Sequence, residues 1–238
     1  IREGERQKRT LEIQALQAQI NPHFIANTLN LIANIASVNN ETGIEQLSNS
    51  LVDLMRDCIR NDERFVQVQD EISMLQSYIN IQDYRMLGKF TVQMQIEKEI
   101  KENLMPHLIL QPIVENAISH GLGNLTSVGT LEISAFEKKD RLYIQIGDDG
   151  EGMEAEKVAE IVRFINTAKP VEGKKNIGIR NVNQRIKLAC GEQYGITIES
   201  TPYQGSRFTI QLPIMREGEE NERIHNTDGR SKKRHSNS

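Results

Sequence analysis

The sequence predicts an α+β protein in which an N-terminal helical hairpin is followed by a two-layer α/β sandwich. Two observations lead to this fold class. In the first part of the chain, apolar residues recur every three or four positions, whereas several segments from Val92 onward alternate apolar and polar residues as strands do. The 238 residues are 37% hydrophobic and 26% charged, which fits one large globular domain or two small ones.

The first segment, residues 5–39, is predicted to be one long helix. Pro22 interrupts it, and we expect a kink there because proline removes a backbone donor and crowds the carbonyl four residues earlier. A turn at residues 41–43 and a second helix over 44–58 would complete an antiparallel hairpin. Its exposed seam would be buried by dimerisation into a four-helix bundle. The seam residues of the first helix are Ile13, Leu16, Ile20, Phe24, Leu31, Ile35 and Val38.

A third helix is expected at about residues 70–87, and the predicted sheet follows it. Residues 138–140 read as a hairpin connection between two strands. Strict alternation leaves one face of the sheet apolar, so helices must cover that face of a largely antiparallel sheet. The predicted strands are residues 92–96, 131–135, 142–146, 196–198 and 208–214. The covering helices are predicted at about residues 107–120, 155–166 and 179–190.

Two segments lack any periodicity. Residues 166–177 contain Pro170 and Gly173 and are predicted to be a loop or lid. Residues 216–238 are almost wholly polar and are predicted to be a disordered tail.

Bulk properties narrow the function classes. A net charge of −4 and a pI near 5.8 argue against a nucleic-acid binder, which usually carries a basic face. The two cysteines, Cys58 and Cys190, are too few for a disulfide framework or a zinc site, so we expect reduced thiols and a cytoplasmic location. The sequence contains no run of 18 apolar residues, so it predicts no transmembrane helix. Because the chain begins with Ile1 rather than Met, we expect a fragment, and any upstream segment, such as a membrane anchor, lies outside this sequence.

A polar helix face in the second half could bind a metal–phosphate group. Asn116 and His120 are four residues apart on the predicted helix, so they share a face beside Glu115. Amide and carboxylate oxygens are hard donors that suit Mg²⁺ bound to phosphates. The alternative interpretation is a polar helix face that is simply solvated.

Two further segments could bind a nucleotide. Residues 148–152 (DDGEG) directly follow a predicted strand, and a carboxylate there can accept a hydrogen bond from an exocyclic amine such as that of adenine. Residues 176–181 (NIGIRN) open a predicted helix, whose free N–H groups attract phosphate, and Lys174, Lys175 and Arg180 add positive charge. An acidic turn and an ordinary helix start are the alternatives. The sequence has no P-loop and no dinucleotide fingerprint, so any nucleotide site has another architecture.

Together, these segments resemble those of a known superfamily. Residues 111–122 (QPIVENAISHGL), 148–153 (DDGEGM) and 176–181 resemble the N, G1 and G2 boxes of the GHKL ATPases of Bergerat fold, which include gyrase, MutL, heat-shock ATPases and histidine kinases. Residues 17–30 (QAQINPHFIANTLN) are similar to the phosphoacceptor box of the LytS/YesM subfamily of sensor histidine kinases. The chain departs from the usual family residue at Ala26, Asp149, Asn176 and Ser206.

The resemblance implies a role for each matching residue. His23 would accept a phosphoryl group from ATP, Asn116 would ligate Mg²⁺, and Glu115 would act as a base or bind a metal-bound water. His120 would lie near the phosphates, and Asp148 would bind the adenine amine. The residues that would shape or line the rest of the ATP pocket are Gly150, Gly152, Gly178, Ile179, Asn181 and Ser206.

The resemblance also implies an organisation. Residues 1–66 would be the helical dimerisation and phosphoacceptor domain, residues 67–215 the ATP-binding catalytic domain, and residues 216–238 the tail. The chain would be a two-component histidine kinase core that autophosphorylates and then phosphorylates an Asp in the receiver domain of a response regulator. It would be a homodimer that binds no nucleic acid. It would form the cytoplasmic portion of an inner- or plasma-membrane receptor, attached only through an upstream segment.

Three other functions share parts of this pattern. A GHKL ATPase clamp would hydrolyse ATP without needing His23. An inactive dimeric signalling scaffold would relay conformation alone, but the intact Asn116, Asp148 and Gly178 argue against it. A serine-directed anti-sigma kinase would share the ATP-binding fold without the hairpin of residues 5–60.

Overall fold

The computed structural model describes residues 22–59, 64–167 and 177–216. Within these residues, no helix combines the length and apolar character needed to cross a bilayer. The chain divides into two compact units. One comprises residues 1–62 with 77–81, and the other comprises residues 63–76 with 82–238.

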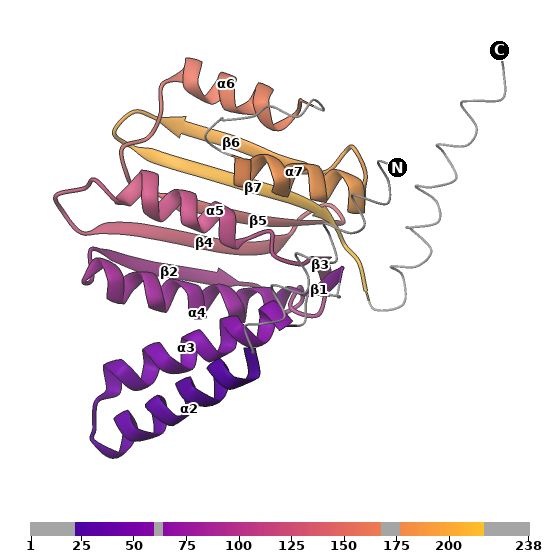
Figure 1. The fold of residues 1–238 in the computed structure, drawn as a ribbon. Helices are drawn as coiled ribbons and strands as arrows, with labels where there is room; N and C mark the ends of the chain where they lie inside the picture. The colour runs from indigo at the N-terminus through magenta and orange to yellow at the C-terminus, as the bar shows by residue number, and fades with distance from the viewer. Residues whose placement is uncertain (1–21, 60–63, 168–176, 217–238) are drawn as a thin grey trace, which may run out of the picture. The chain divides into compact units, whose positions relative to one another are not determined.

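The first unit is built on a helical hairpin of α2 (Pro22–Val38) and α3 (Thr42–Ile59), labelled in Figure 1. Asn40 has a left-handed φ of 59°, and the Glu41 N–H donates to the Ala36 carbonyl at 2.9 Å, which closes the turn. The second predicted helix is confirmed. The turn precedes the predicted residues 41–43, because Asn40 rather than a glycine adopts the left-handed conformation.

The helix α2 has two different faces. Its buried residues are the small Ala26, Ala33 and Ala36, which lie on one stripe and let a neighbouring helix approach closely. Its large apolar residues are instead exposed: Leu31 by 58%, Ile35 by 55% and Val38 by 82%. These three belong to the predicted seam. The upstream part of that seam lies outside the described residues, and so do the residues before Pro22 that the expected kink would involve.

The second unit contains a five-stranded sheet in the order β2-β4-β5-β7-β6. Neighbouring strands are antiparallel except for the parallel pair β2 and β4, so the prediction of a largely antiparallel sheet is confirmed. The strands are β2 (Phe90–Ile96), β4 (Gly129–Glu137), β5 (Arg141–Asp148), β6 (Gly195–Thr201) and β7 (Gly205–Pro213). Parallel neighbours need a crossover connection, and the one between β2 and β4 contains the helix of the candidate site.

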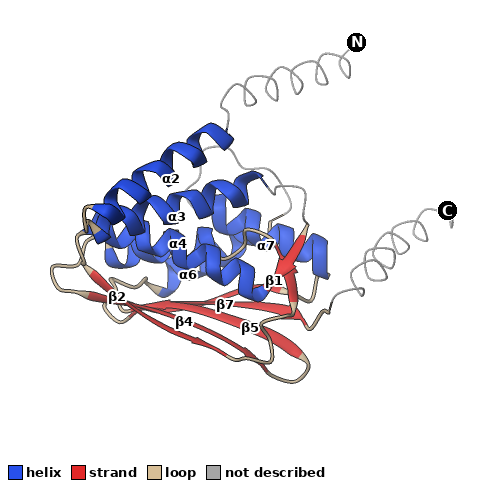
Figure 2. Ribbon diagram, turned by 90° about the horizontal axis from the view of Figure 1, so that it is seen from below, coloured by secondary structure: helices blue, strands red, loops and turns tan. Residues whose placement is uncertain are grey.

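The core of the second unit lies between the sheet and its helices. Figure 2 shows α6 (Ala155–Ile165) and α7 (Ile177–Cys190) on the same face of the sheet. Alternate residues of the strands point to this face and are at most 1% exposed, which confirms the predicted two-layer arrangement. The most buried of them are Leu131, Ile133, Leu142, Ile144, Ile146, Phe208, Ile210 and Leu212.

The remaining elements agree with the sequence in part. The predicted third helix is α4 (Val68–Met86), which contributes residues to both units. Lys139 and Asp140 have left-handed φ values of 54° and 56°, which is the conformation of a type I′ hairpin turn and confirms the predicted connection. Two strands of three residues each, β1 (Phe65–Gln67) and β3 (Leu104–Pro106), pair with each other and were too short to show alternation.

The helix predicted at residues 107–120 begins later than expected. Residues 107–110 form a loop, α5 spans Gln111–Asn116, and a π-helix, η1, continues over Ala117–Leu122. The π-helical hydrogen bonds run to the fifth residue along rather than the fourth, and such turns are frequent at functional sites.

Candidate functional site

The continuous α5–η1 helix divides cleanly into a buried and a polar face. Ile113, Val114, Ala117, Ile118, Gly121 and Leu122 are at the buried side. Glu115, Ser119 and His120 are exposed, and Asn116 is half-buried. The structure therefore brings the three predicted residues Glu115, Asn116 and His120 to one polar surface of the helix.

The two ends of this helix meet the two other predicted segments. At its start, a Cβ atom built on Gly178 would lie 3.5 Å from the Pro112 Cβ, so the beginning of α7 is in contact distance of the beginning of α5. At its end, the Glu151 N–H donates to the Gly121 carbonyl at 3.3 Å. The polar face with Asn116 thus runs between the segment of residues 177–181 and the segment of residues 148–152.

Glycines allow close backbone contacts around Asp148 at the second of these ends. A Cβ on Gly121 would overlap the Asp148 carboxylate, and one on Gly150 would overlap the Gly121 carbonyl. A Cβ on Gly205 would overlap the Asp148 carbonyl, and one on Gly152 would overlap the carbonyl of Thr201. These contacts require glycine at each position, because any side chain would push the helix, the loop and the strands apart.

Asp148 is an unusual carboxylate because it is only 8% exposed. Its pKa is raised from a usual 3.8 to about 6, chiefly by burial and to a lesser extent by the nearby Asp149, while backbone N–H groups of Gly150 and Ser206 oppose the rise. The Gly150 N–H donates to Oδ1 at 3.0 Å. A ligand that donated one more hydrogen bond to this group would favour its charged form.

Residues around Asp148 hold the strand ends in place. Ser206 lies directly opposite Asp148 in the β5–β7 register, and its hydroxyl lies 3.0 Å from the Ser200 hydroxyl. Gly205 has a φ of +89°, in the region that favours glycine. Asp149 points elsewhere, since its Oδ1 accepts a hydrogen bond from the Thr130 N–H at 2.6 Å.

At the start of α7, the backbone is accessible to a ligand, whereas the apolar side chain of Ile179 is not. Gly178 and Asn181 are exposed, whereas Ile179 is 2% exposed and packs in the core, so a ligand could reach only its backbone. The Arg180 guanidinium lies over the Phe164 ring at 5.6 Å and donates to the Thr167 carbonyl at 3.0 Å. Arg180 therefore contacts the end of α6. Lys174 and Lys175 lie outside the described residues.

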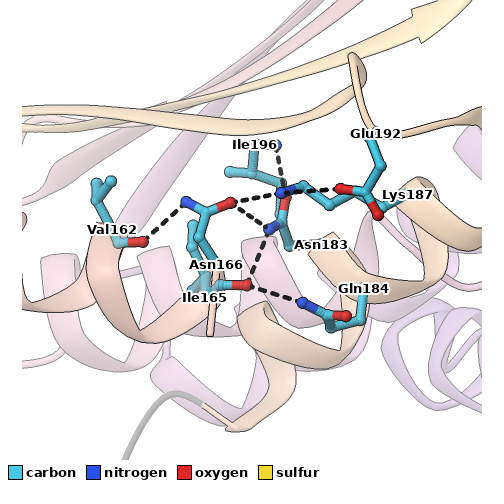
Figure 3. Close-up of polar contacts among 8 residues, drawn as sticks. All are labelled: Val162, Ile165, Asn166, Asn183, Gln184, Lys187, Glu192 and Ile196. Carbon is cyan, nitrogen blue, oxygen red and sulfur yellow. Dashed lines mark hydrogen bonds and ion pairs between the residues drawn. The ribbon is translucent and has the colours of Figure 1, made fainter. Parts of the chain in front are cut away.

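Figure 3 shows a polar cluster that ties α7 to α6 and β6. The Asn183 side chain, in a residue only 1% exposed, donates to the Ile165 carbonyl at 3.0 Å and accepts from the Ile196 N–H at 2.9 Å. The Lys187 ammonium donates to the Asn166 side-chain oxygen at 2.7 Å. One buried amide thereby links the end of a helix to the start of a strand, and this fixes the helix that begins with Gly178.

The phosphoacceptor candidate belongs to the other unit. His23 lies in the first turn of α2, and its side chain lies outside the described atoms. Among the described residues, no three His, Cys, Asp or Glu side chains gather as a metal-binding group. A polar hollow of about 390 Å³ borders Asp148, Ser206 and Arg207, but neither Asn116 nor Gly178 lines it, so it is distinct from the polar helix face.

Sequence reasoning missed several residues that build this site. Gly121 lies inside the motif of residues 111–122, but its contact with the Asp148 carboxylate could not be predicted, because Asp148 is far along the chain. Glu71, Asn183 and Arg185 have no local motif, since each one bonds to backbone groups of a distant segment. For Glu71, the one signal in the sequence was an acidic residue in the first turn of the predicted third helix.

Two family comparisons match the chain and together span most of it. Residues 11–90 match the family described as "Histidine kinase", and residues 102–216 match "Histidine kinase-, DNA gyrase B-, and HSP90-like ATPase". The chain belongs to the histidine kinases. The second match contains the α5–η1 helix, the glycines around Asp148 and the start of α7, and it implies that this kinase uses ATP.

Relatives of this histidine kinase agree with the assignment. "Sensor histidine kinase YesM" of Bacillus subtilis (strain 168) is 35% identical over 206 residues, which cover 87% of this chain and 34% of the relative. "Sensor protein LytS" of Bacillus anthracis is 30% identical over 204 residues, covering 85% and 34%. The kinase chain thus spans about a third of the length of the curated relatives it matches.

A solved structure is also similar to this kinase chain. It is the "Histidine kinase domain from Erythrobacter litoralis EL346 blue-light activated histidine kinase", with a TM-score of 0.48 and 15% identity. The similarity covers 86% of this chain and 97% of that one.

Proposed function

We propose that this chain is the core of a two-component sensor histidine kinase, which binds Mg²⁺–ATP in the second unit and phosphorylates His23. The observation that carries the proposal is the enclosure of Asp148, where Gly121 lies against the carboxylate, the Gly150 N–H donates to its Oδ1, and Gly205 lies against the backbone carbonyl. This enclosure lies at one end of a helix whose polar face presents Glu115 and Asn116. The buried Asp148 carboxylate can accept a hydrogen bond from a base, and the oxygen atoms of Glu115 and Asn116 can serve a metal ion. This arrangement suits a nucleotide with its base at Asp148 and its phosphates toward α7.

Adenine recognition follows from the chemistry of Asp148. The adenine amine is a donor, so it would give the carboxylate a hydrogen bond in place of those that water makes to an exposed carboxylate. Guanine presents a carbonyl oxygen at the equivalent ring position, and two acceptors facing each other in a buried site repel. We therefore expect ATP to bind more tightly than GTP.

The donor chemistry of the α5–η1 helix also fits Mg²⁺. Asn116 would hold the ion through its amide oxygen, and the Glu115 carboxylate would bind one of the waters that Mg²⁺ usually keeps. When bound, the ion would neutralise charge on the phosphates. Gly178 and Asn181 at the start of α7 would receive the phosphate oxygens, where helical N–H groups favour an anion. His120 would lie close to the same phosphates.

The proposed reaction is an in-line phosphoryl transfer. A neutral ring nitrogen of His23 attacks the terminal phosphorus, an N–P bond forms, and the bond to the bridging oxygen breaks so that ADP leaves. An unperturbed histidine is mostly neutral above about pH 6.5, so little activation is needed. The phosphohistidine then passes its phosphoryl group to an aspartate in the receiver domain of a response regulator.

We assign the proposed roles to the parts of the chain as the motifs suggest. Residues 1–66 would dimerise and carry His23, and residues 67–215 would bind ATP. The exposed Leu31, Ile35 and Val38 support a homodimer, because a second copy of the hairpin would cover them in a four-helix bundle. Membrane attachment would come from a segment upstream of this chain.

Labelling with γ-phosphate tests the proposal. The chain is incubated with γ-labelled ATP and Mg²⁺, and its label is tested for the acid lability and alkali stability of phosphohistidine. His23→Gln should abolish the label, and His225→Gln serves as the matched control that should keep it. Label that persists in His23→Gln would move the acceptor elsewhere. ATP turnover without any label would favour an ATPase clamp, and the lack of nucleotide binding would favour a scaffold.

A further inference from the structure

A buried carboxylate in the second unit supports the site described above without belonging to its polar face. Glu71, in the first turn of α4, is only 1% exposed. Its Oε1 accepts hydrogen bonds from the backbone N–H groups of Ile109 at 2.8 Å and Leu110 at 3.0 Å. Its Oε2 accepts one from the Leu108 N–H at 2.9 Å. Burial raises the pKa of this carboxyl, while the three backbone bonds and the nearby His107 oppose the rise.

The segment that receives these bonds leads into the helix of the candidate site. Leu108 has a left-handed φ of 57°, which is uncommon for a residue other than glycine. Leu110 is the N-cap of α5 and has no side-chain oxygen with which to cap it. The Glu71 carboxylate therefore supplies acceptors to backbone donors that would otherwise be buried without a partner.

A second side chain holds the same loop from another helix. Arg185 of α7 donates from its guanidinium to the His107 carbonyl at 2.6 Å. Residues 107–110 are thus held by α4 through their N–H groups and by α7 through a carbonyl. Glu71 is 1% exposed, so it is not placed to touch a nucleotide bound at the polar face with Asn116.

We propose that Glu71 is a positioning residue for the phosphate end of the nucleotide site, because it holds the loop from which the helix with Glu115 and Asn116 begins. This inference rests on the proposed function, since it takes Mg²⁺–ATP as the ligand. Asn116 is six residues beyond Leu110, or less than two helical turns, so a displaced loop displaces Asn116 with it. A misplacement of about 1 Å in a phosphoryl-transfer site lowers the rate by about 100-fold.

Three variants separate positioning from general stability. Glu71→Gln keeps the shape and two acceptor bonds, but its amide NH₂ group would face the Leu108 N–H, which is also a donor. Asp70→Asn is the matched control, because it makes the same charge change in the same turn at an exposed residue. Arg185→Met disturbs the same loop from α7 and decides the question if Glu71→Gln does not fold.

Calorimetry with an ATP analogue whose β–γ bond does not hydrolyse gives the readout, once with Mg²⁺ and once with EDTA. We expect Glu71→Gln to weaken binding by about tenfold or more in Mg²⁺, and by less than about twofold in EDTA, where binding depends on the adenine end. Arg185→Met should show the same pattern with a smaller factor. Asp70→Asn should bind like the wild type under both conditions.

The outcomes distinguish the two levels of the argument. Equal weakening with and without Mg²⁺, or wild-type binding by Glu71→Gln, overturns the positioning role while the proposed function stands. Equal weakening in Asp70→Asn also overturns it, because the cause would then be charge alone. If the wild-type chain binds no nucleotide, the proposed function fails and takes this inference with it.

Discussion

Replacing Asp148 by asparagine should stabilise the protein while removing its affinity for adenine. The carboxyl has a folded pKa of about 6 and a usual value of 3.8, so its ionisation is more difficult in the folded state. A difference of about 2.2 pKa units corresponds to about 3 kcal/mol of unfolding free energy. Because the folded pKa is raised, this penalty is absent below pH 3.8 and is complete above about pH 6. Asparagine does not ionise and escapes it.

The pH dependence is the sharper quantity, because lost hydrogen bonds of the variant affect all pH values alike. Integrating the titration gives a penalty of about 3 kcal/mol at pH 8 and about 1 kcal/mol at pH 4.5. The stability of Asp148→Asn relative to the wild type should therefore rise by about 2 kcal/mol between pH 4.5 and pH 8. Even if the variant loses the Ser206 bond, at about 1 kcal/mol, this difference remains.

Urea denaturation at the two pH values measures this difference directly. Glu137→Gln, at an exposed carboxylate on the neighbouring strand β4, serves as the control and should show little change. If the stability difference between Asp148→Asn and the wild type is the same at both pH values within about 0.5 kcal/mol, the carboxylate is not desolvated as described. The same variant should bind ATP at least about tenfold more weakly at pH 8, because its amide presents a donor to the adenine amine.

Three further predictions follow from other contacts. Gly121→Ala should weaken ATP binding at least about tenfold by calorimetry, since its methyl group overlaps a carboxylate, whereas Gly147→Ala, with its nearest neighbour at 3.7 Å, should not. Asn183→Leu should lower the unfolding free energy by about 2–4 kcal/mol in urea, because it leaves the buried Ile196 N–H without a partner and leaves the Ile165 carbonyl with only the Gln184 side chain as a side-chain donor. Ile35→Glu should shift the chain toward monomer in sedimentation equilibrium, and wild-type dimerisation of this variant would refute the proposed interface. Asn34→Glu, also exposed on α2, is its matched control.

Sequence periodicity predicted correctly those helices and strands whose apolar pattern lies within the element itself. Alternation identified β4, β5 and β7, because these strands bury one face against helices and leave the other exposed. The start of α5 was predicted wrongly for the opposite reason. Residues 107–110 are apolar enough to read as helix, yet Glu71 and Arg185 hold them as a loop through bonds from distant segments. Periodicity contains no information about such bonds.

The candidate site shows the same division. The polar face with Asn116 could be predicted from spacing alone, because residues four apart on a helix lie together. The surroundings of Asp148 could not, since they depend on Gly121 and Gly205, which meet it only when the helix and strand β7 are in place. The motif resemblance named the segments, but the physical reason for their glycines appears only in three dimensions.

The energetics of Asp148 connect the fold to the proposed function. The Gly121 backbone lies against the Asp148 carboxylate, and burial of this group raises its pKa to about 6. The protein would be more stable with a neutral residue there, so packing alone does not explain the acid. A ligand amine that donated a hydrogen bond would recover part of the lost solvation, and only a ligand of that kind would do so. In the proposed function, the destabilised carboxylate would therefore be a source of adenine specificity, since the penalty carried by the free protein would become part of the difference in affinity between ATP and GTP.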